Sequence, residues 1–140
     1  MLTTYFLNCI TEDIFRHQED PHVPKDYYVG LSSTTPQMDG TGVTEPTADT
    51  GYARANVDNT IKNFDEADDS GIVSNQLTVY FPESIKPWNG ITHYVIYDLP
   101  EGGQLLMYGA LNETMNVPIK TMVSIPVGTL KLSTENGVVD

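Results

Sequence analysis

Histidine side chains are the first candidates for chemistry, because imidazole binds transition metals and transfers protons near neutral pH. The chain has three, and their spacing is unlike that of a zinc site, which groups ligands at short defined intervals. His17 and His22 flank the end of an apolar-periodic segment, with a proline between them. His93 has no partner in sequence and alternates with Ile91 and Val95. We predict no transition-metal site and a hydrogen-bonded structural role for His93.

Nucleophilic catalysis has no recognisable arrangement in this sequence. The G-x-S-x-G turn that presents a catalytic serine is absent. Cys9 is the single cysteine, so no intrachain disulfide can form, and no histidine stands in a recognisable arrangement with it. Because Cys9 lies within an apolar helical pattern, we interpret it as a buried, inert thiol.

Carboxylates are plentiful, and a β-sandwich can carry a glycosidase. Such an enzyme needs two carboxyl groups about 5 to 10 Å apart in a cleft, one of them with a raised pKa. Most of the acids fall in predicted loops and turns, where a solvated carboxylate is expected: Asp39, Glu45, Asp49, Asp58, Asp65, Glu66, Asp68, Asp69, Glu83 and Asp98. We predict no catalytic residue and no enzymatic activity. A glycosidase stays open as an alternative, to be tested by the presence of such a cleft.

The acidic turn from Asp65 to Asp69 offers several oxygen ligands of the kind that calcium prefers. It lacks the EF-hand spacing, with no glycine at the sixth position and no terminal glutamate. We interpret it as a solvated turn and predict no metal or other cofactor, keeping as calcium candidates Asp65, Glu66, Asp68 and Asp69.

Aromatic residues could stack on sugar rings, and the chain has eight tyrosines and one tryptophan. Together with the long polar loop from Gln37 to Thr50, they allow a carbohydrate-binding surface. Core packing is the simpler interpretation. Trp88 follows Pro87 in a predicted turn, and we expect it to cap the core.

Length and charge restrict the classes of partner. The chain has 140 residues, which suits one domain with a real core, and a net charge of −12 with a pI near 4.3. Such a surface repels nucleic acid and anionic lipid. We see no signal peptide and no apolar run long enough to span a membrane. We therefore expect no nucleic-acid or membrane partner, and folding in a reducing cytoplasm.

The N-terminal segment predicts a helix over residues 2–18, capped by Thr3 or Thr4. Its apolar residues recur at three- and four-residue spacing and form one wide stripe. Such a stripe must be buried on the chain's own sheet or against a copy of the chain. The residues that we predict to contact a partner are Leu2, Tyr5, Phe6, Ile10 and Ile14. Prolines then limit the helix, and residues 19–26 are expected to form an extended strap.

The rest of the chain reads as about seven strands separated by turns. The strongest signal is a hairpin within residues 91–111, in which two β-rich runs flank a turn at residues 100–103. Further strands are expected at 27–32, 51–57, one bent strand or two within 72–81, and a final pair, 121–125 and 129–133, joined through 126–128. A loop is expected from Asn112 to Pro118, and a fraying polar tail from Glu135.

This pattern predicts a mainly β protein, an antiparallel, jelly-roll-like β-sandwich with an N-terminal α-helix and an extended strap. We divide it into a docking and oligomerisation segment (1–26), a β-sandwich domain (27–134) and a polar tail (135–140).

An ordered series of short motifs resembles a family of small bacteriophage virion proteins, described as tail-fibre or phage structural proteins. The series covers most of the chain from Tyr27 onward and consists of 27–36, 39–46, 51–54, 73–75, Phe81-Pro82, 88–94, 96–98, 102–111 and 125–130. One departure is Asn89 before Gly90, where a glycine directly after Trp88 is expected.

The resemblance implies a virion component present in many copies, most simply a tail-fibre part that docks through its N-terminal helix and displays a β-sandwich. A head decoration or collar protein and a carbohydrate-binding receptor-recognition module are the alternatives. The implied partners are other virion proteins and copies of the chain itself, in a trimer or higher multimer, with a host glycan under the last alternative. The implied location is the virion, assembled in the host cytoplasm. Deletion of residues 1–26 is expected to abolish incorporation and leave a folded domain.

Overall fold

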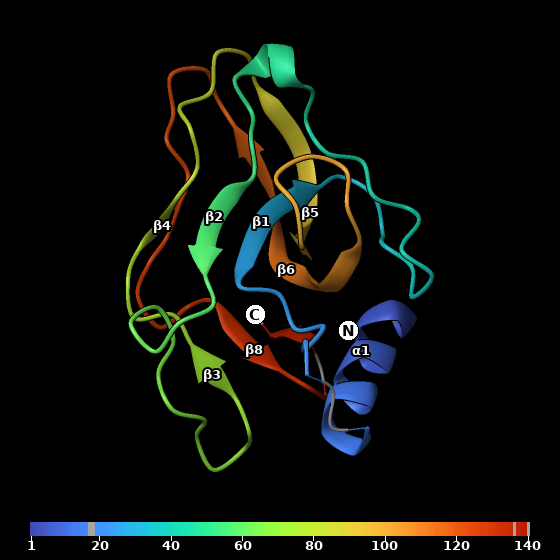
Figure 1. Cartoon of the computed structure of the whole chain (residues 1–140). Helices are drawn as coiled ribbons and strands as arrows, with labels where there is room; N and C mark the ends of the chain where they lie inside the picture. The colour runs from blue at the N-terminus through green and yellow to red at the C-terminus, as the bar shows by residue number, and fades with distance from the viewer. Residues whose placement is uncertain (17–18, 136, 140) are drawn as a thin grey trace.

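The computed structural model describes residues 1–16, 19–135 and 137–139 (Figure 1). Its elements in chain order are α1 (Thr4–Phe15), β1 (Asp26–Ser32), a 3-10 turn (Ala48–Thr50), β2 (Ala55–Asp58), β3 (Val73–Ser74), β4 (Val79–Tyr80), β5 (Trp88–Tyr97), β6 (Leu105–Val117), β7 (Ser124–Ile125), β8 (Lys131–Ser133) and β9 (Gly137–Val139). The mainly antiparallel β fold with one N-terminal helix is therefore confirmed. His17, Gln18, Asn136 and Asp140, on which parts of the helix, histidine and tail predictions rest, lie outside the described residues.

The main sheet has four antiparallel strands in the order β2-β1-β5-β6. The predicted hairpin is confirmed as β5 and β6, the two longest strands, and its turn lies where the glycines Gly102 and Gly103 adopt positive φ. β6 continues to Val117, so the loop expected from Asn112 is wrong. The register of β6 against β5 shifts between Ile91 and His93. The polar residues of β6 that resemble a loop in the sequence lie at this irregularity.

Two smaller sheets cover one face of the main sheet, which gives the protein its sandwich-like arrangement (Figure 1). One has the order β3-β8-β9 and the other pairs β4 with β7. The core between the layers takes Val29, Leu31 and Ile96 from the main sheet. It takes Phe81 and Ile125 from the smaller sheets and their loops. Alternation along the strands explains this, because every second side chain faces the same layer.

Trp88 is 1% exposed, and its Nε1 donates a hydrogen bond to the Thr50 carbonyl oxygen at 3.2 Å. Its ring meets the ring of Tyr52 edge to face, with the centroids 5.4 Å apart. The predicted core role of Trp88 is confirmed, and it fixes the 3-10 turn to the start of β5.

Three strand predictions are corrected. Residues 121–125 and 129–133 do not pair with each other: β7 pairs with β4, and β8 pairs with β3 and β9. The strand expected to start at Gly51 starts at Ala55, because residues 48–50 form the 3-10 turn and Gly51 closes it at φ 85°. The sequence predicts a fraying tail, but its described part forms β9, in which Val138 is buried. Burial of this apolar side chain stabilises the strand despite the polar residues around it.

The helix α1 is fastened to the sandwich at its first turn. Thr3 caps it as predicted, since its Oγ1 accepts a hydrogen bond from the Phe6 amide at 3.3 Å. The same hydroxyl donates to the Leu105 carbonyl at 2.6 Å, and the Thr3 amide donates to the Leu106 carbonyl at 2.9 Å. Asp13 then accepts hydrogen bonds from the backbone amides of the strap, which holds the strap beside the helix.

Candidate functional site

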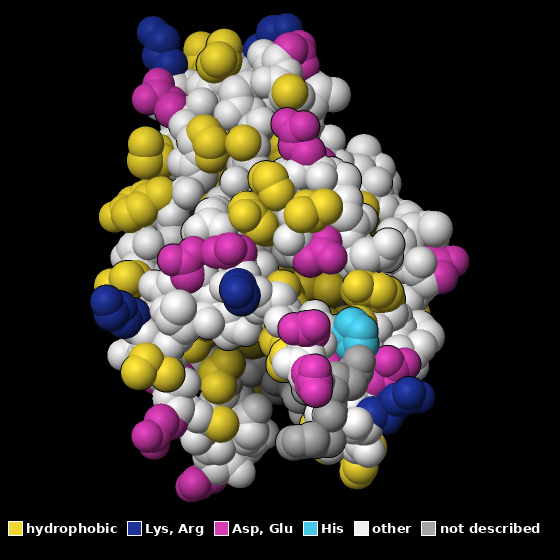
Figure 2. Space-filling model, viewed as in Figure 1, with side chains coloured by type: hydrophobic (Ala, Val, Ile, Leu, Met, Phe, Trp, Pro, Cys, Tyr) yellow, Lys and Arg dark blue, Asp and Glu magenta, His cyan; other side chains and the backbone are white. Residues whose placement is uncertain are grey.

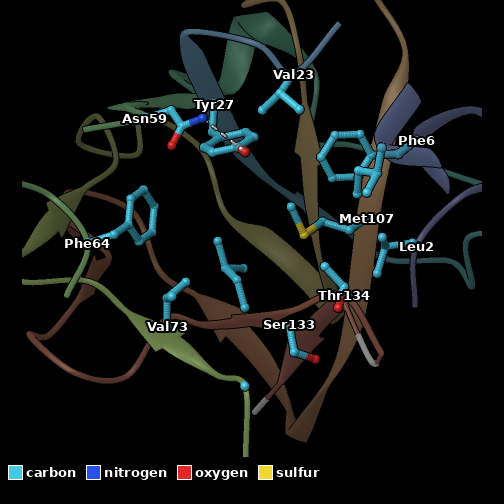
Figure 3. A pocket seen from close by; sticks show the side chains of 13 residues that line it. Leu2, Phe6, Val23, Tyr27, Asn59, Phe64, Val73, Met107, Ser133 and Thr134 are labelled. Atoms are coloured by element: carbon cyan, nitrogen blue, oxygen red, sulfur yellow. Dashed lines mark hydrogen bonds between the residues drawn. The ribbon is translucent and has the colours of Figure 1, made fainter. Parts of the chain in front are cut away.

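A cavity of about 330 Å³ lies between α1, β6, β1 and the β3-β8-β9 sheet, and its lining is mostly apolar (Figure 3). In the close-up, Phe6, Met107 and Leu2 stand on one side and Phe64 and Val73 face them across the opening. The floor residues are buried: Leu2, Phe6, Tyr27, Met107 and Leu132 are all less than a tenth exposed. The remaining lining residues reach the surface, so the cavity opens to solvent.

Polar groups line this cavity at opposite edges. On one edge Asn59 Nδ2 donates to Tyr27 Oη at 3.3 Å and to the Pro24 carbonyl at 3.0 Å (Figure 3). On the other lie Ser133 and Thr134. Burial raises the pKa of Tyr27, whose ring packs edge to face on Phe64 at 6.1 Å between centroids. Among residues 1–16, 19–135 and 137–139, no charged side chain lines the cavity, so this lining is suited to apolar contact and not to acid–base chemistry.

The five residues predicted to contact a partner separate into three groups by their exposure. Leu2 and Phe6, 3% and 4% exposed, lie in the chain's own core, which corrects their placement on a partner surface. Ile10 is half-buried and lines the cavity. Tyr5 and Ile14 remain exposed. The helix therefore buries the middle of its stripe on its own sheet, one of the two outcomes that the stripe allowed.

The outer surface of α1 carries apolar side chains that the described part of the chain leaves uncovered. Ile14 is 65% exposed and Phe15 80% exposed at the end of the helix. At 100° per residue, Leu7 and Ile14 fall on the same flank, two turns apart. Phe15 extends this flank around the side opposite the core. Leu7, Ile14 and Phe15 are named here the outer flank of α1.

Further exposed apolar side chains follow the edge formed by β4 and β7. Tyr80 is 62% exposed and Met122 is 55% exposed. Tyr80 pairs in register with Ser124, so Tyr80 and Met122 lie on the outer side of this edge. Figure 2 shows apolar side chains gathered along the margin where β4 runs in Figure 1.

The long loop before β2 is fixed by a partly buried ion pair that the sequence did not single out. The Arg54 side chain, 6% exposed, donates from Nε and Nη2 to the two carboxylate oxygens of Glu45 at 2.9 and 3.0 Å. Its Nη1 donates to the carbonyls of Leu99 and Gly102, both at 2.8 Å. Its guanidinium lies 3.5 Å from the centroid of the Tyr97 ring. The loop and the hairpin turn are thus joined to one side chain, which we name the Arg54 clamp.

Tyr52 and Gly30 extend the clamp to the main sheet. Tyr52 Oη donates to Glu45 at 2.8 Å and accepts from the Leu31 amide at 2.9 Å. Burial, followed by the Glu45 charge, raises the pKa of Tyr52. A Cβ on Gly30 would stand 2.6 Å from Glu45 Oε1 and 2.7 Å from Tyr52 Oη. Glycine at this strand position is the one sequence signal that a side chain approaches the backbone closely here.

Two of the four calcium candidates, Asp65 and Asp68, accept hydrogen bonds from backbone amides. Asp65 Oδ1 accepts from the Ser74 amide at 2.7 Å, and Asp68 Oδ1 accepts from the amides of Ser70 and Ile72. Among residues 1–16, 19–135 and 137–139, no group of three or more His, Cys, Asp or Glu side chains is arranged to hold a metal ion. Glu66 and Asp69 are exposed.

The other candidates for chemistry have structural surroundings. Cys9 is a buried free thiol. His93 Nδ1 lies 2.8 Å from Thr92 Oγ1, and partial burial lowers the pKa of His93. Within the part of the chain that the structure describes, no helix is long and apolar enough to cross a bilayer.

Comparison with known proteins agrees with a structural role. A family sequence model described as "Podophage GP4 fiber I protein gp80" matches residues 1–133, which is nearly the whole chain and includes α1, the strap and every strand from β1 to β8. No curated protein matches the chain in sequence. The family match supports a structural role in a phage tail fibre, and so a component of the virion. By this match the chain belongs to the podophage GP4 fiber I protein gp80 family.

Proposed function

We propose that this chain is a subunit of the podophage tail fibre that docks on neighbouring virion proteins and on copies of itself, and that it displays the β-sandwich outward. The observation that carries the proposal is the outer flank of α1. Ile14 and Phe15 are 65% and 80% exposed on a helix that is rigidly joined to the sandwich. Adjacent exposed apolar side chains on a rigid element are typical of an interaction surface.

Assembly in several symmetric copies is the general expectation for repeated parts of a particle. The exposed apolar side chains of the β4–β7 edge offer a second contact for such copies. The sandwich is held by its own core and the Arg54 clamp, which suits a module that keeps its shape when only one side of it is attached.

The test is incorporation into particles of a phage that carries the double variant Ile14→Ser and Phe15→Ser. Both side chains are largely exposed, so the purified variant is expected to keep its melting temperature, while its copy number per particle falls several-fold. Ile61→Ser is the matched control, because Ile61 is 91% exposed on a different part of the surface. Normal incorporation of the double variant would contradict docking through α1.

Deletion of residues 1–26 is a poorer test than the sequence suggested. The deletion removes Leu2, Phe6 and Cys9 from the core, where each is less than a tenth exposed. It also uncovers Met107, which Leu2 pairs against. Loss of incorporation would then report unfolding as readily as loss of a docking surface.

A cleft beside the Arg54 clamp, lined by both polar and apolar groups, favours a second candidate function, recognition of a host glycan. The cleft has a volume of about 430 Å³ and is lined by residues of the long loop and of the hairpin turn, among them Glu45, Pro46 and Glu101. The Tyr97 ring, which could stack on a sugar, is covered by Arg54. Absence of binding on a glycan array at roughly millimolar ligand would dismiss this candidate.

A further inference from the structure

The cavity beneath α1 has the size and lining of a receptor for an apolar side chain. Its volume of about 330 Å³ is at the lower end of the range for ligand sites, about 300 to 1,000 Å³. Half-buried side chains, Val23 and Val73 among them, lead from its buried floor to the surface. Hot spots of protein interfaces are typically a large apolar or aromatic anchor in such a pocket.

Carboxylates stand beside the lining residues on several sides of this cavity. Asp13 accepts from the amide of Val23 at 3.1 Å, and Asp65 accepts from the amide that follows Val73. Asp58 precedes the lining residue Asn59, and Asp68 accepts in the turn that ends at Gly71. Hydrogen bonds, first from the His22 amide, lower the pKa of Asp13, so this carboxyl is ionised at neutral pH.

Basic groups stand near this cavity as well: exposed Lys25 lies between the lining residues Val23 and Tyr27, and His22 Nδ1 lies 3.2 Å from Asp13 Oδ1. Lys131 precedes Leu132, and strand alternation directs the exposed Lys131 side chain away from the face on which Leu132 is buried. These four carboxylates still outnumber the basic groups, and the whole chain carries a net charge of −12. The cavity therefore combines an apolar floor with mainly acidic surroundings, named here the Asp13, Asp58, Asp65 and Asp68 rim. Its complement is an apolar anchor flanked by positive charges.

We propose that the cavity beneath α1 receives an apolar anchor side chain, flanked by lysine or arginine, from a different virion protein. The inference rests on the proposed function and names the chemistry of the docking partner. A second copy of this chain fits less well, because each copy carries a net charge of −12 and two acidic rims repel.

The probes are two hexapeptides of the same apolar content, GKLFKG and GELFEG, titrated against the full chain labelled on its methionine methyl groups. Met107 is 4% exposed and lines the cavity, so its methyl resonance reports occupation directly. The basic peptide is expected to shift the Met107 resonance with saturation, and to bind at least about tenfold more tightly than the acidic peptide. Raising the salt concentration is expected to reduce that ratio.

One pair of variants tests whether the cavity takes the anchor, and a further variant tests whether the carboxylates attract its flanking positive charges. Val73→Phe fills the opening and is expected to abolish the Met107 shift, whereas Val127→Phe, at a side chain 57% exposed away from the lining, leaves it unchanged. The variant Asp58→Asn removes the exposed carboxylate of the rim that stands directly before the lining residue Asn59. It is expected to weaken the basic peptide about three- to tenfold without lowering the melting temperature.

Each contrary outcome overturns the inference. No shift of Met107 with either peptide would show that the cavity takes no anchor. Equal affinity for both peptides would remove the argument from charge. A shift of Met107 with protein concentration alone, lost in Val73→Phe, would make a second copy the occupant.

Failure of the proposed function is measured separately. If the Ile14→Ser and Phe15→Ser particles assemble normally while the peptides bind as expected, docking through the outer flank fails and the cavity proposal stands. If incorporation falls as expected and neither peptide binds, the reverse holds.

Discussion

Replacement of Arg54 by alanine tests whether the Arg54 clamp holds the long loop to the sheet. The change removes both bonds to Glu45, both bonds to the hairpin-turn carbonyls, and the contact with the Tyr97 ring. Glu45 stays behind without its cation, only 22% exposed and still bonded to Tyr52. The substitution therefore leaves an uncompensated, partly buried carboxylate, which costs more stability than a missing contact alone.

The expected cost follows from the burial of the pair. Removing one member of a fully buried ion pair costs about 3 to 5 kcal/mol. Water reaches the exposed part of Glu45 and solvates it again, which reduces the figure to about 2 to 4 kcal/mol. For a chain of this length that is a fall in melting temperature of about 7 to 14 °C.

Urea unfolding followed by the fluorescence of Trp88, the single and fully buried tryptophan, measures this cost. The matched control is Lys86→Ala, which breaks the exposed pair with Asp49, whose side chains are 60% and 62% exposed. That pair is expected to contribute little to stability, because water screens both of its charges. If Arg54→Ala costs no more than Lys86→Ala, the clamp does not stabilise the fold and the reasoning is wrong.

Two further substitutions test the sheet. In Gly109→Ala, the added Cβ would overlap the Val138 carbonyl oxygen, so β9 must move; we expect a cost of about 1 to 3 kcal/mol. Hydrogen exchange should then rise at the amides of β8 and β9 and stay unchanged in β4 and β7. Asp58 lies directly opposite Asp26, and a hydrogen bond with that carboxyl, more than burial, raises the pKa of Asp58 above 3.8. Folding therefore favours the protonated form, and ionisation at neutral pH costs stability that is recovered as the pH falls. Asp58→Asn should raise the melting temperature at pH 7 by about 1 to 3 °C. If the gain were equally large below pH 3.8, the ionised Asp58 carboxylate would not be the source of the lost stability.

Local signals predicted the elements that local interactions decide. The hairpin of β5 and β6 joins strands that are neighbours in sequence, and the glycines of its turn mark it directly. The start of α1 at the Thr3 cap follows the same logic. The pairing of β7 with β4 and of β8 with β3 could not be predicted in this way, because these partners are far apart in the chain and the strands are only two or three residues long.

The candidate site shows the same limit. The apolar stripe of the helix was visible in the sequence, but whether Phe6 or Ile14 faces the chain's own sheet depends on where β6 lies. The cavity is built from six separate segments of the chain, and no spacing in the sequence brings them together. Glu45 looks like an ordinary loop charge and Arg54 like an ordinary strand residue until the fold pairs them and brings Glu45 against Gly30.

A density map of the intact virus from electron microscopy tests the central claim most directly. The account predicts this sandwich within the tail fibre, with the outer flank of α1 and the cavity beneath it covered by neighbouring chains. A map in which the chain is absent from the particle, or in which that whole side faces solvent, would contradict it.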